Sequence, residues 1–287
     1  MKRLAIVLAL ATAVGCGGGG GRTLIQSKGS DTLVNVAQAW AEAYATVDPN
    51  VAVAVSGGGS GVGLTGLIDG TTEIANSSRK IKSKEIEAAR KHGIEPKEFV
   101  VGYDALAVYV HKDNPIEKIT IAQLAGIYGD DGTITKWSQL GVTMPGGAQN
   151  DTIVRVSRQN NSGTYVYFKE AVLGEGHDYK LGSIDQSGSK DVVDLVARTM
   201  GAIGYSGLAY ATPEVKLVPV AQDDAAPPVM PTMDTAIDGS YPIARPLFMY
   251  TAGEPQGAVK AYLDWILSDA GQKIIHDKGY APVRKLD

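Results

Sequence analysis

Three segments rich in glycine and serine each connect a short strand-like run to a helical pattern, and they constrain this chain more than any other feature. They read GSDTL (29–33), SGGGSG (56–61) and RQNNSGT (158–164). The first backbone N–H groups of a helix have no partner within the helix, and small residues let a ligand approach them closely. Such N-termini favour an anion. One loop alone is typical of a Ser/Thr N-cap, whereas three together predict an oxyanion site.

Strand-like and helix-like patterns alternate along the chain from residue 22 onward. The run VAVAV (51–55) is typical of a buried strand, and residues 32–47 carry apolar side chains at helical spacing. Further strands are expected at 24–30, 73–78, 99–110, 152–158 and 241–251, and further helices at 83–93, 119–129, 164–174 and 257–280, with Gly271 as a candidate break in the last. This alternation predicts an α/β fold with largely parallel sheets, in which ligands bind at the carboxyl ends of strands.

Composition excludes several classes of protein. The 287 residues predict about two domains, and 20% charged with 44% hydrophobic residues argue against disorder. The net charge is −4, whereas a nucleic-acid binder usually carries an excess of basic residues, so composition does not indicate nucleic-acid binding. A single cysteine excludes a disulfide scaffold and a multi-thiolate zinc site.

The N-terminus predicts export and a membrane anchor. Residues 1–16 combine a basic start with a short apolar stretch, as in a signal peptide. Cys16 follows Val14 and Gly15 in a pattern that resembles a lipobox, although Ala13 stands where leucine is usual. We expect Cys16 to be lipidated and residues 17–23 to form a glycine-rich tether, so that the protein is held at a membrane in the periplasm or at the cell surface. The alternative is an incidental cysteine.

Motifs of other functions fit poorly. Residues 61–66 match G-x-G-x-x-G, but the expected acidic residue at the end of the next strand is missing. A Walker motif lacks its lysine, and the nucleophile elbow at Ser60 has Val62 where glycine is needed. The four histidines lack metal-ligand spacing, and no paired carboxylates suggest hydrolysis. We therefore expect no cofactor, no metal and no enzymatic activity.

The combination of GSDTL, GGGSG, NSSR (76–79) and R-x-x-x-SGT resembles the periplasmic phosphate-binding proteins of phosphate ABC transporters. The segments GAIGYSGLAY (201–210), YPIARPLFMYT (241–251) and LDWILSDAGQKII (263–275) extend this resemblance over the mature chain. It implies a type II periplasmic-binding fold, in which two α/β lobes are joined by two crossover strands with a ligand cleft between them. Lobe I would comprise residues 24–103 plus 247–287, and lobe II residues 104–246.

The resemblance also implies which residues hold the ligand. Hydroxyl, backbone N–H and guanidinium donors to phosphate would come from Thr32, Leu33, Ser60, Ser78, Arg158, Ser162, Gly163 and Thr164. Arg158 would be the only full positive charge on the ligand. Ser78 stands where some family members carry an aspartate that accepts the proton of hydrogen phosphate. Asp31 is a candidate replacement for that acceptor, the alternative being a helix-capping carboxylate.

The implied function is high-affinity binding of inorganic phosphate outside the cytoplasm by a monomer that delivers it to membrane permease subunits. Nucleic acid is not an expected partner. Three alternatives stay open: a receptor for sulfate, molybdate or arsenate, an exported phosphatase, and an adhesin or scaffold without affinity for oxyanions.

Overall fold

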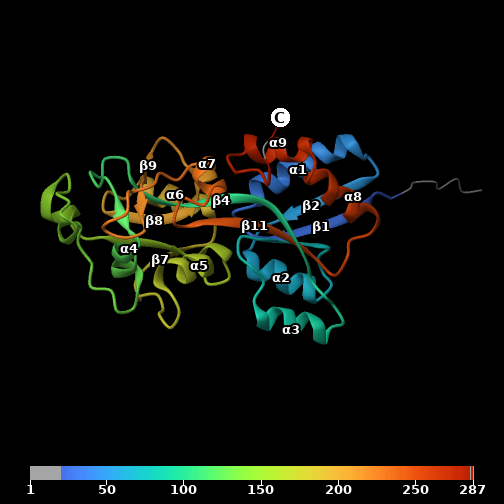
Figure 1. The fold of residues 1–287 in the computed structure, drawn as a ribbon, viewed down its shortest axis with the longest axis horizontal. Coiled ribbons are helices and arrows are strands. Elements are labelled where there is room, and N and C mark those ends of the chain that lie inside the picture. Colours follow the sequence, from blue (N-terminus) through green and yellow to red (C-terminus); the bar gives the residue numbers. More distant parts are fainter. Residues whose placement is uncertain (1–20, 285, 287) are drawn as a thin grey trace, which may run out of the picture.

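The computed structural model describes residues 21–284 and residue 286. The predicted signal peptide with Cys16 and residues 17–20 of the predicted tether lie outside the described residues. The chain forms two lobes side by side, and strands β4 and β11 run through both (Figure 1). Among the described residues, nine strands form one continuous sheet in the order β2-β1-β3-β11-β4-β8-β6-β7, with β9 also paired to β4.

The first lobe is built on a parallel trio of strands, in which β1 lies between β2 and β3. These strands are β1 (Thr23–Gly29), β2 (Val51–Ser56) and β3 (Ile74–Ser77). Helices α1 (Val34–Val47), α8 (Gly257–Ile266) and α9 (Asp269–Asp277) cover one face (Figure 1). Helix α2 (Ser60–Ile68) covers the other face, and α3 (Ser83–Lys91) packs on the outer side of α2 (Figure 1). Trp40, Tyr262 and Ile275 lie in its buried core.

Strand β4 (Lys97–His111) carries the chain from the first lobe into the second. Its residues 97–105 pair with β11 (Ala244–Thr251), which returns the chain, whereas residues 106–111 pair with β8 and β9. The sheet of the second lobe contains β6 (Val154–Arg158), β7 (Ile184–Gln186), β8 (Ala202–Gly207) and β9 (Val215–Val218). The predicted crossover of two strands is therefore confirmed.

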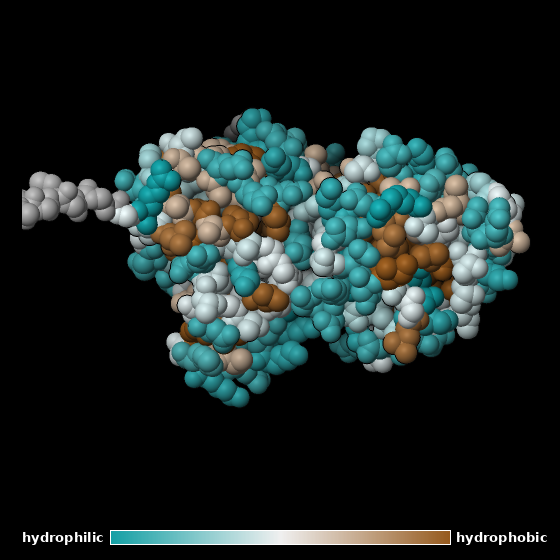
Figure 2. Space-filling view, turned by 180° about the vertical axis from the view of Figure 1, so that it is seen from behind, coloured by the Kyte–Doolittle hydropathy of each residue, from teal (hydrophilic) through white to brown (hydrophobic). Residues whose placement is uncertain are grey.

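The second lobe has its own helices and its own core. Its helices are α4 (Ile121–Tyr128), α5 (Gly163–Phe168), α6 (Ser189–Ala197) and α7 (Met233–Ile237). A π-helical turn (Lys169–Leu173) follows α5, and β5 (Ile119–Thr120) pairs with β10 (Val220–Ala221). The rings of Phe168 and Tyr205 stack with centroids 3.8 Å apart in the core. Separate cores leave mainly hydrophilic residues along the line where the lobes meet (Figure 2).

The structure corrects two expectations about the elements. The sheet is parallel only in its outer parts, because β11 and β4 run antiparallel to their neighbours where the chain crosses between lobes. The terminal helix breaks at Leu267 and Ser268, not at Gly271. Gly271 lies within α9, and a Cβ there would be 2.3 Å from the carbonyl oxygen of Ile266, so this glycine permits close packing. Among the described residues, no helix has both the length and the apolar character needed to span a bilayer.

Candidate functional site

The three glycine- and serine-rich loops meet where the two lobes face each other. The hydroxyl oxygens of Thr32 and Thr164, from different lobes, are 3.0 Å apart. The Gly61 N–H donates to the carbonyl of Asn161 at 3.1 Å, and the Asn161 side-chain amide donates to the carbonyl of Gly58 at 2.9 Å. The lobes are therefore in direct contact through the segments that the sequence singled out.

Two serines of the first lobe face the start of α5. The Ser78 N–H donates to Oγ of Ser60 at 3.1 Å, and both side chains are buried. A Cβ on Gly163 would lie 2.2 Å from Ser60 Oγ and 2.6 Å from Ser78 Oγ. The missing side chain of Gly163 thus lets the second lobe approach both hydroxyls. Ser162 caps α5 by accepting a hydrogen bond from the Thr164 N–H at 3.2 Å.

Arg158 ends β6 and is fully buried. Its Nη2 donates to Oδ2 of Asp31 at 3.0 Å and to the carbonyl of Ser187 at 2.7 Å, and its Nη1 donates to Oγ of Ser189 at 3.0 Å. Burial lowers the pKa of Arg158, and the Asp31 carboxylate opposes this effect. Oδ1 of Asp31 accepts from the Gly58 N–H at 2.9 Å. Both oxygens of Asp31 are therefore engaged, and its role as a proton acceptor stays a prediction.

The turn that carries Thr32 is fixed by two tyrosines. Tyr210 donates through its hydroxyl to the Asp31 carbonyl at 2.7 Å, with the Thr32 carbonyl as a second, longer acceptor at 3.2 Å, and Tyr280 donates to the Thr32 carbonyl. Burial raises the pKa of Tyr210 to about 12, so its hydroxyl stays protonated and able to donate. The N–H of Leu33 donates to the carbonyl of Ser30 at 3.1 Å, and its side chain lies in the core. Its predicted contact with the ligand stays a prediction.

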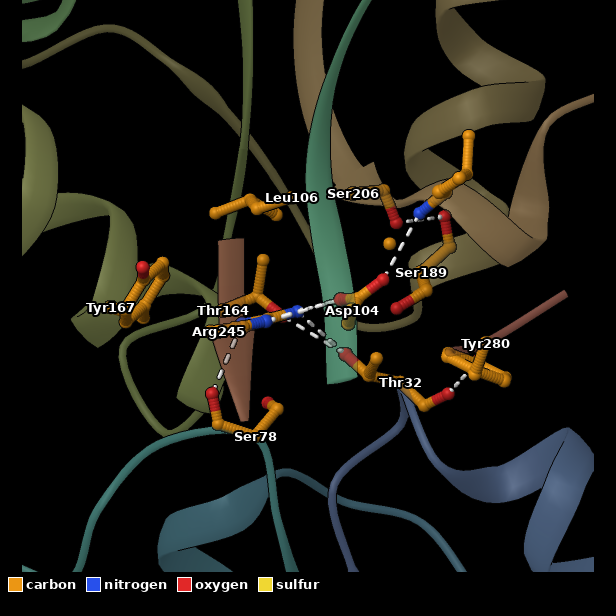
Figure 3. A network of polar contacts seen from close by, with 12 residues as sticks. Thr32, Ser78, Asp104, Leu106, Thr164, Tyr167, Ser189, Ser206, Arg245 and Tyr280 are labelled. Atoms are coloured by element: carbon orange, nitrogen blue, oxygen red, sulfur yellow. Dashed lines mark hydrogen bonds and ion pairs between the residues drawn. The ribbon is translucent and has the colours of Figure 1, made fainter. Parts of the chain in front are cut away.

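A buried ion pair that the sequence analysis did not place in the site lies at its centre. Arg245 of β11 and Asp104 of β4 are directly opposite in the sheet and each 1% exposed. Oδ2 of Asp104 accepts from Nη2 at 2.8 Å and from Nε at 3.1 Å. Nη2 also donates to the hydroxyls of Thr164 at 3.1 Å and Thr32 at 3.3 Å, and Nη1 donates to the carbonyl of Ser78 at 3.2 Å (Figure 3).

The electrostatics of the site follow from its burial. Desolvation raises the pKa of Asp104, although the neighbouring Arg245 opposes that effect. Arg158 and Arg245 also repel each other, which lowers the pKa of Arg158. Two buried guanidiniums close enough to interact, surrounded by hydroxyl groups, form an arrangement suited to a tetrahedral oxyanion.

Comparison with known proteins identifies the family. A family model described as the PBP superfamily domain matches residues 17–270. The phosphate-binding protein PstS of Pseudomonas aeruginosa is 36% identical over 270 residues, which cover 90% of this chain and 83% of that protein. The chain belongs to the phosphate-binding proteins of ABC transporters. PstS of Bacillus subtilis is 32% identical over 259 residues, covering 89% of this chain and 79% of that protein.

A solved member of this family gives the structural match. A phosphate ABC transporter substrate-binding protein of Clostridium perfringens, crystallised with phosphate, superimposes with a TM-score of 0.80 at 30% identity, covering 91% of this chain and all of that one. The predicted type II periplasmic-binding fold is confirmed. The sequence held a signal for the ion pair that was missed, since Asp104 and Arg245 each interrupt an otherwise apolar strand. A charge is rarely buried unless it is paired.

Proposed function

We propose that this protein binds inorganic phosphate in the cleft between its lobes and delivers it to the permease subunits of an ABC transporter. The observation that carries the proposal is the convergence of donors from both lobes, in which the Thr32 and Thr164 hydroxyls lie 3.0 Å apart and both accept from the buried Arg245. The buried Arg158 pairs with Asp31, the neighbour of Thr32. The names of the relatives, with the phosphate held by the Clostridium perfringens structure, support the same ligand.

The proposed phosphate ligands are the residues on the three loops and after β3. They are Thr32, Leu33, Ser60, Ser78, Arg158, Ser162, Gly163 and Thr164. Each charge-assisted hydrogen bond contributes about 1.5–3 kcal/mol, so a small set of such bonds holds an anion although the protein carries a net charge of −4. The attraction for phosphate thus comes from the donors that line the cleft and not from the charge of the whole protein.

Division into lobe I (residues 24–103 plus 247–287) and lobe II (104–246) is part of the proposal. It is supported by the change in partners along β4, whose residues up to 105 pair with β11 and whose residues from 106 pair with β8. Phosphate would bind between the lobes and favour their closure by a hinge movement at β4 and β11. We expect a monomer that lipidated Cys16 anchors to a membrane, in the periplasm or at the cell surface.

A second candidate ligand is a fully deprotonated oxyanion such as sulfate. It is favoured by Ser78, because a serine at this position does not repel an anion that lacks a proton as a carboxylate would. Calorimetric titration of the purified protein with phosphate and with sulfate at pH 6 and pH 8 separates the two candidates. Tight binding of phosphate with weak binding of sulfate supports the phosphate receptor, equal binding supports a general oxyanion receptor, and no heat with either refutes both.

The protein is proposed to act without catalysis. Turnover of a phosphate monoester, measured with and without divalent metal ions, would contradict this part of the proposal. We expect none, because the predicted ligands are hydrogen-bond donors and the two carboxylates of the site, the partly exposed Asp31 and the buried Asp104, are already paired with Arg158 and Arg245.

A further inference from the structure

Arg245 contacts more of the proposed ligand residues than any other side chain in the network of Figure 3. Its guanidinium reaches the Thr32 hydroxyl and the Ser78 carbonyl of the first lobe and the Thr164 hydroxyl of the second. By contrast, the hydrogen bonds found for Arg158 reach Asp31 and the segment 186–189.

We propose that Arg245 is a second phosphate-binding arginine, which donates to the same oxyanion as Arg158 at the point where the Thr32 and Thr164 hydroxyls converge. The inference rests on the proposed function and assigns to that site a residue outside the three loops. It replaces the expectation that Arg158 is the only full positive charge on the ligand.

The first argument is a donor of the guanidinium that is only weakly used. Arginine has five N–H groups in a fixed plane. Nε and one N–H of Nη2 are directed at Asp104, and one N–H of Nη1 at Ser78. The second N–H of Nη2 is shared by two neutral hydroxyls at 3.1 and 3.3 Å, both longer than its 2.8 Å bond to Asp104. A phosphate oxygen beside these hydroxyls would replace this shared bond to neutral oxygens by a shorter and stronger bond between opposite charges.

The second argument concerns the two hydroxyls. Thr32 and Thr164 both accept from Arg245, and one of them donates to the other. A hydroxyl has a single hydrogen to donate, so one hydroxyl hydrogen is left for a further acceptor. Arg245 thereby orients both hydroxyls so that they present a donor to a ligand.

The third argument separates this role from a purely structural ion pair. Asp104 is held on its other side, where Oδ1 accepts from the Leu208 N–H at 3.2 Å, and Gly207 leaves room for the carboxylate. Replacing a buried ion pair by apolar residues is often neutral or stabilising, so this pair by itself is weak evidence for a role in stability. Its place among the donors of both lobes is explained by ligand binding.

The test uses two variants of the full protein. The double variant Arg245→Gln with Asp104→Asn removes both charges together and leaves no buried charge unpaired. Arg245→Lys keeps the charge but loses the planar fork that reaches both hydroxyls. Arg155→Gln is the matched control, since this half-buried arginine of β6 donates to the Leu181 carbonyl. Each protein is titrated calorimetrically with inorganic phosphate, and its thermal unfolding is followed by circular dichroism.

We expect the double variant to unfold cooperatively and to bind phosphate at least about tenfold more weakly than the wild type, since one charge-assisted bond is lost. Arg245→Lys should show an intermediate loss, and the control none. A folded double variant that binds phosphate within twofold of the wild type overturns the proposal. If the double variant does not fold, wild-type affinity in Arg245→Lys overturns it instead. A wild type that fails to bind phosphate refutes the proposed function itself, before any variant is compared.

Discussion

Gly163→Ala tests whether phosphate is held by closure of the two lobes on each other. The new Cβ would lie 2.2 Å from Ser60 Oγ, whereas ordinary contacts begin at 3.4 Å, so the two groups must separate by about 1.2 Å (3.4 − 2.2). Rotation of both Ser60 and Ser78 would be needed to relieve the clash within the closed site, because the new Cβ would also lie 2.6 Å from Ser78 Oγ, and it would leave the Ser78 N–H without its 3.1 Å acceptor, at a cost of about 1–3 kcal/mol. Separation of the lobes would instead weaken the contact between Thr32 and Thr164.

By either route phosphate binding should weaken, by roughly 5- to 150-fold for that range of free energy. Gly163 is the first residue of α5 and has no positive φ, so alanine suits its backbone and the ligand-free protein should unfold at the wild-type temperature. The measurement is phosphate calorimetry, with small-angle scattering to follow closure. Gly66→Ala in α2 is the control, because its Cβ would meet only side-chain atoms at 3.2 Å or more. Wild-type affinity in Gly163→Ala would refute the reasoning.

Three further changes test the site and its surroundings. Arg158→Gln leaves Asp31 unpaired beside the ligand, and we expect calorimetry to show at least a hundredfold loss of phosphate affinity; Arg155→Gln should bind normally. Ser162→Ala removes a helix cap and should lower the unfolding free energy by about 1 kcal/mol in urea titrations. Burial opposes ionisation of Glu85, but hydrogen bonds from Arg79 and from the backbone lower its pKa overall. Its contribution to stability is therefore present above its ordinary pKa of 4.5 and lost as pH falls below that value, so Glu85→Gln should flatten the acid side of the pH–stability curve; an equally steep curve would contradict this.

The loops were predictable from sequence because their signal is local. A strand-like run, then glycine and serine, then helical spacing is visible within about a dozen residues, as around Ser60 and Ser162. The carboxyl ends of parallel strands gather such loops at one edge of a sheet, so the meeting of Thr32 with Thr164 followed from the fold class and the family resemblance. The periodicities also gave most helices and strands, with errors of a few residues at their ends.

The central ion pair was not predictable in the same way. Asp104 and Arg245 are 141 positions apart in the sequence, and each stands in an apolar run that reads as an ordinary buried strand. Their pairing depends on the antiparallel register of β4 and β11, which a pattern of parallel α/β units does not indicate. The position of the break in the terminal helix was also missed, because a glycine in a helical pattern suggests a break. Gly271 instead lies within α9, where the absence of a side chain lets that helix pack closely against Ile266 at the end of α8.

The crossing of the chain through β4 and β11 also sets an order of assembly. All strands of the second lobe lie between these crossings in the sequence, so a chain made from its N-terminus completes that lobe first. The sheet of the first lobe must wait, because β11 pairs between β3 and β4 and α8 and α9 follow it. Until β11 emerges, β3 keeps an unpaired edge exposed to other chains. Delayed export or truncation near the C-terminus should therefore leave the first lobe, rather than the second, prone to aggregation.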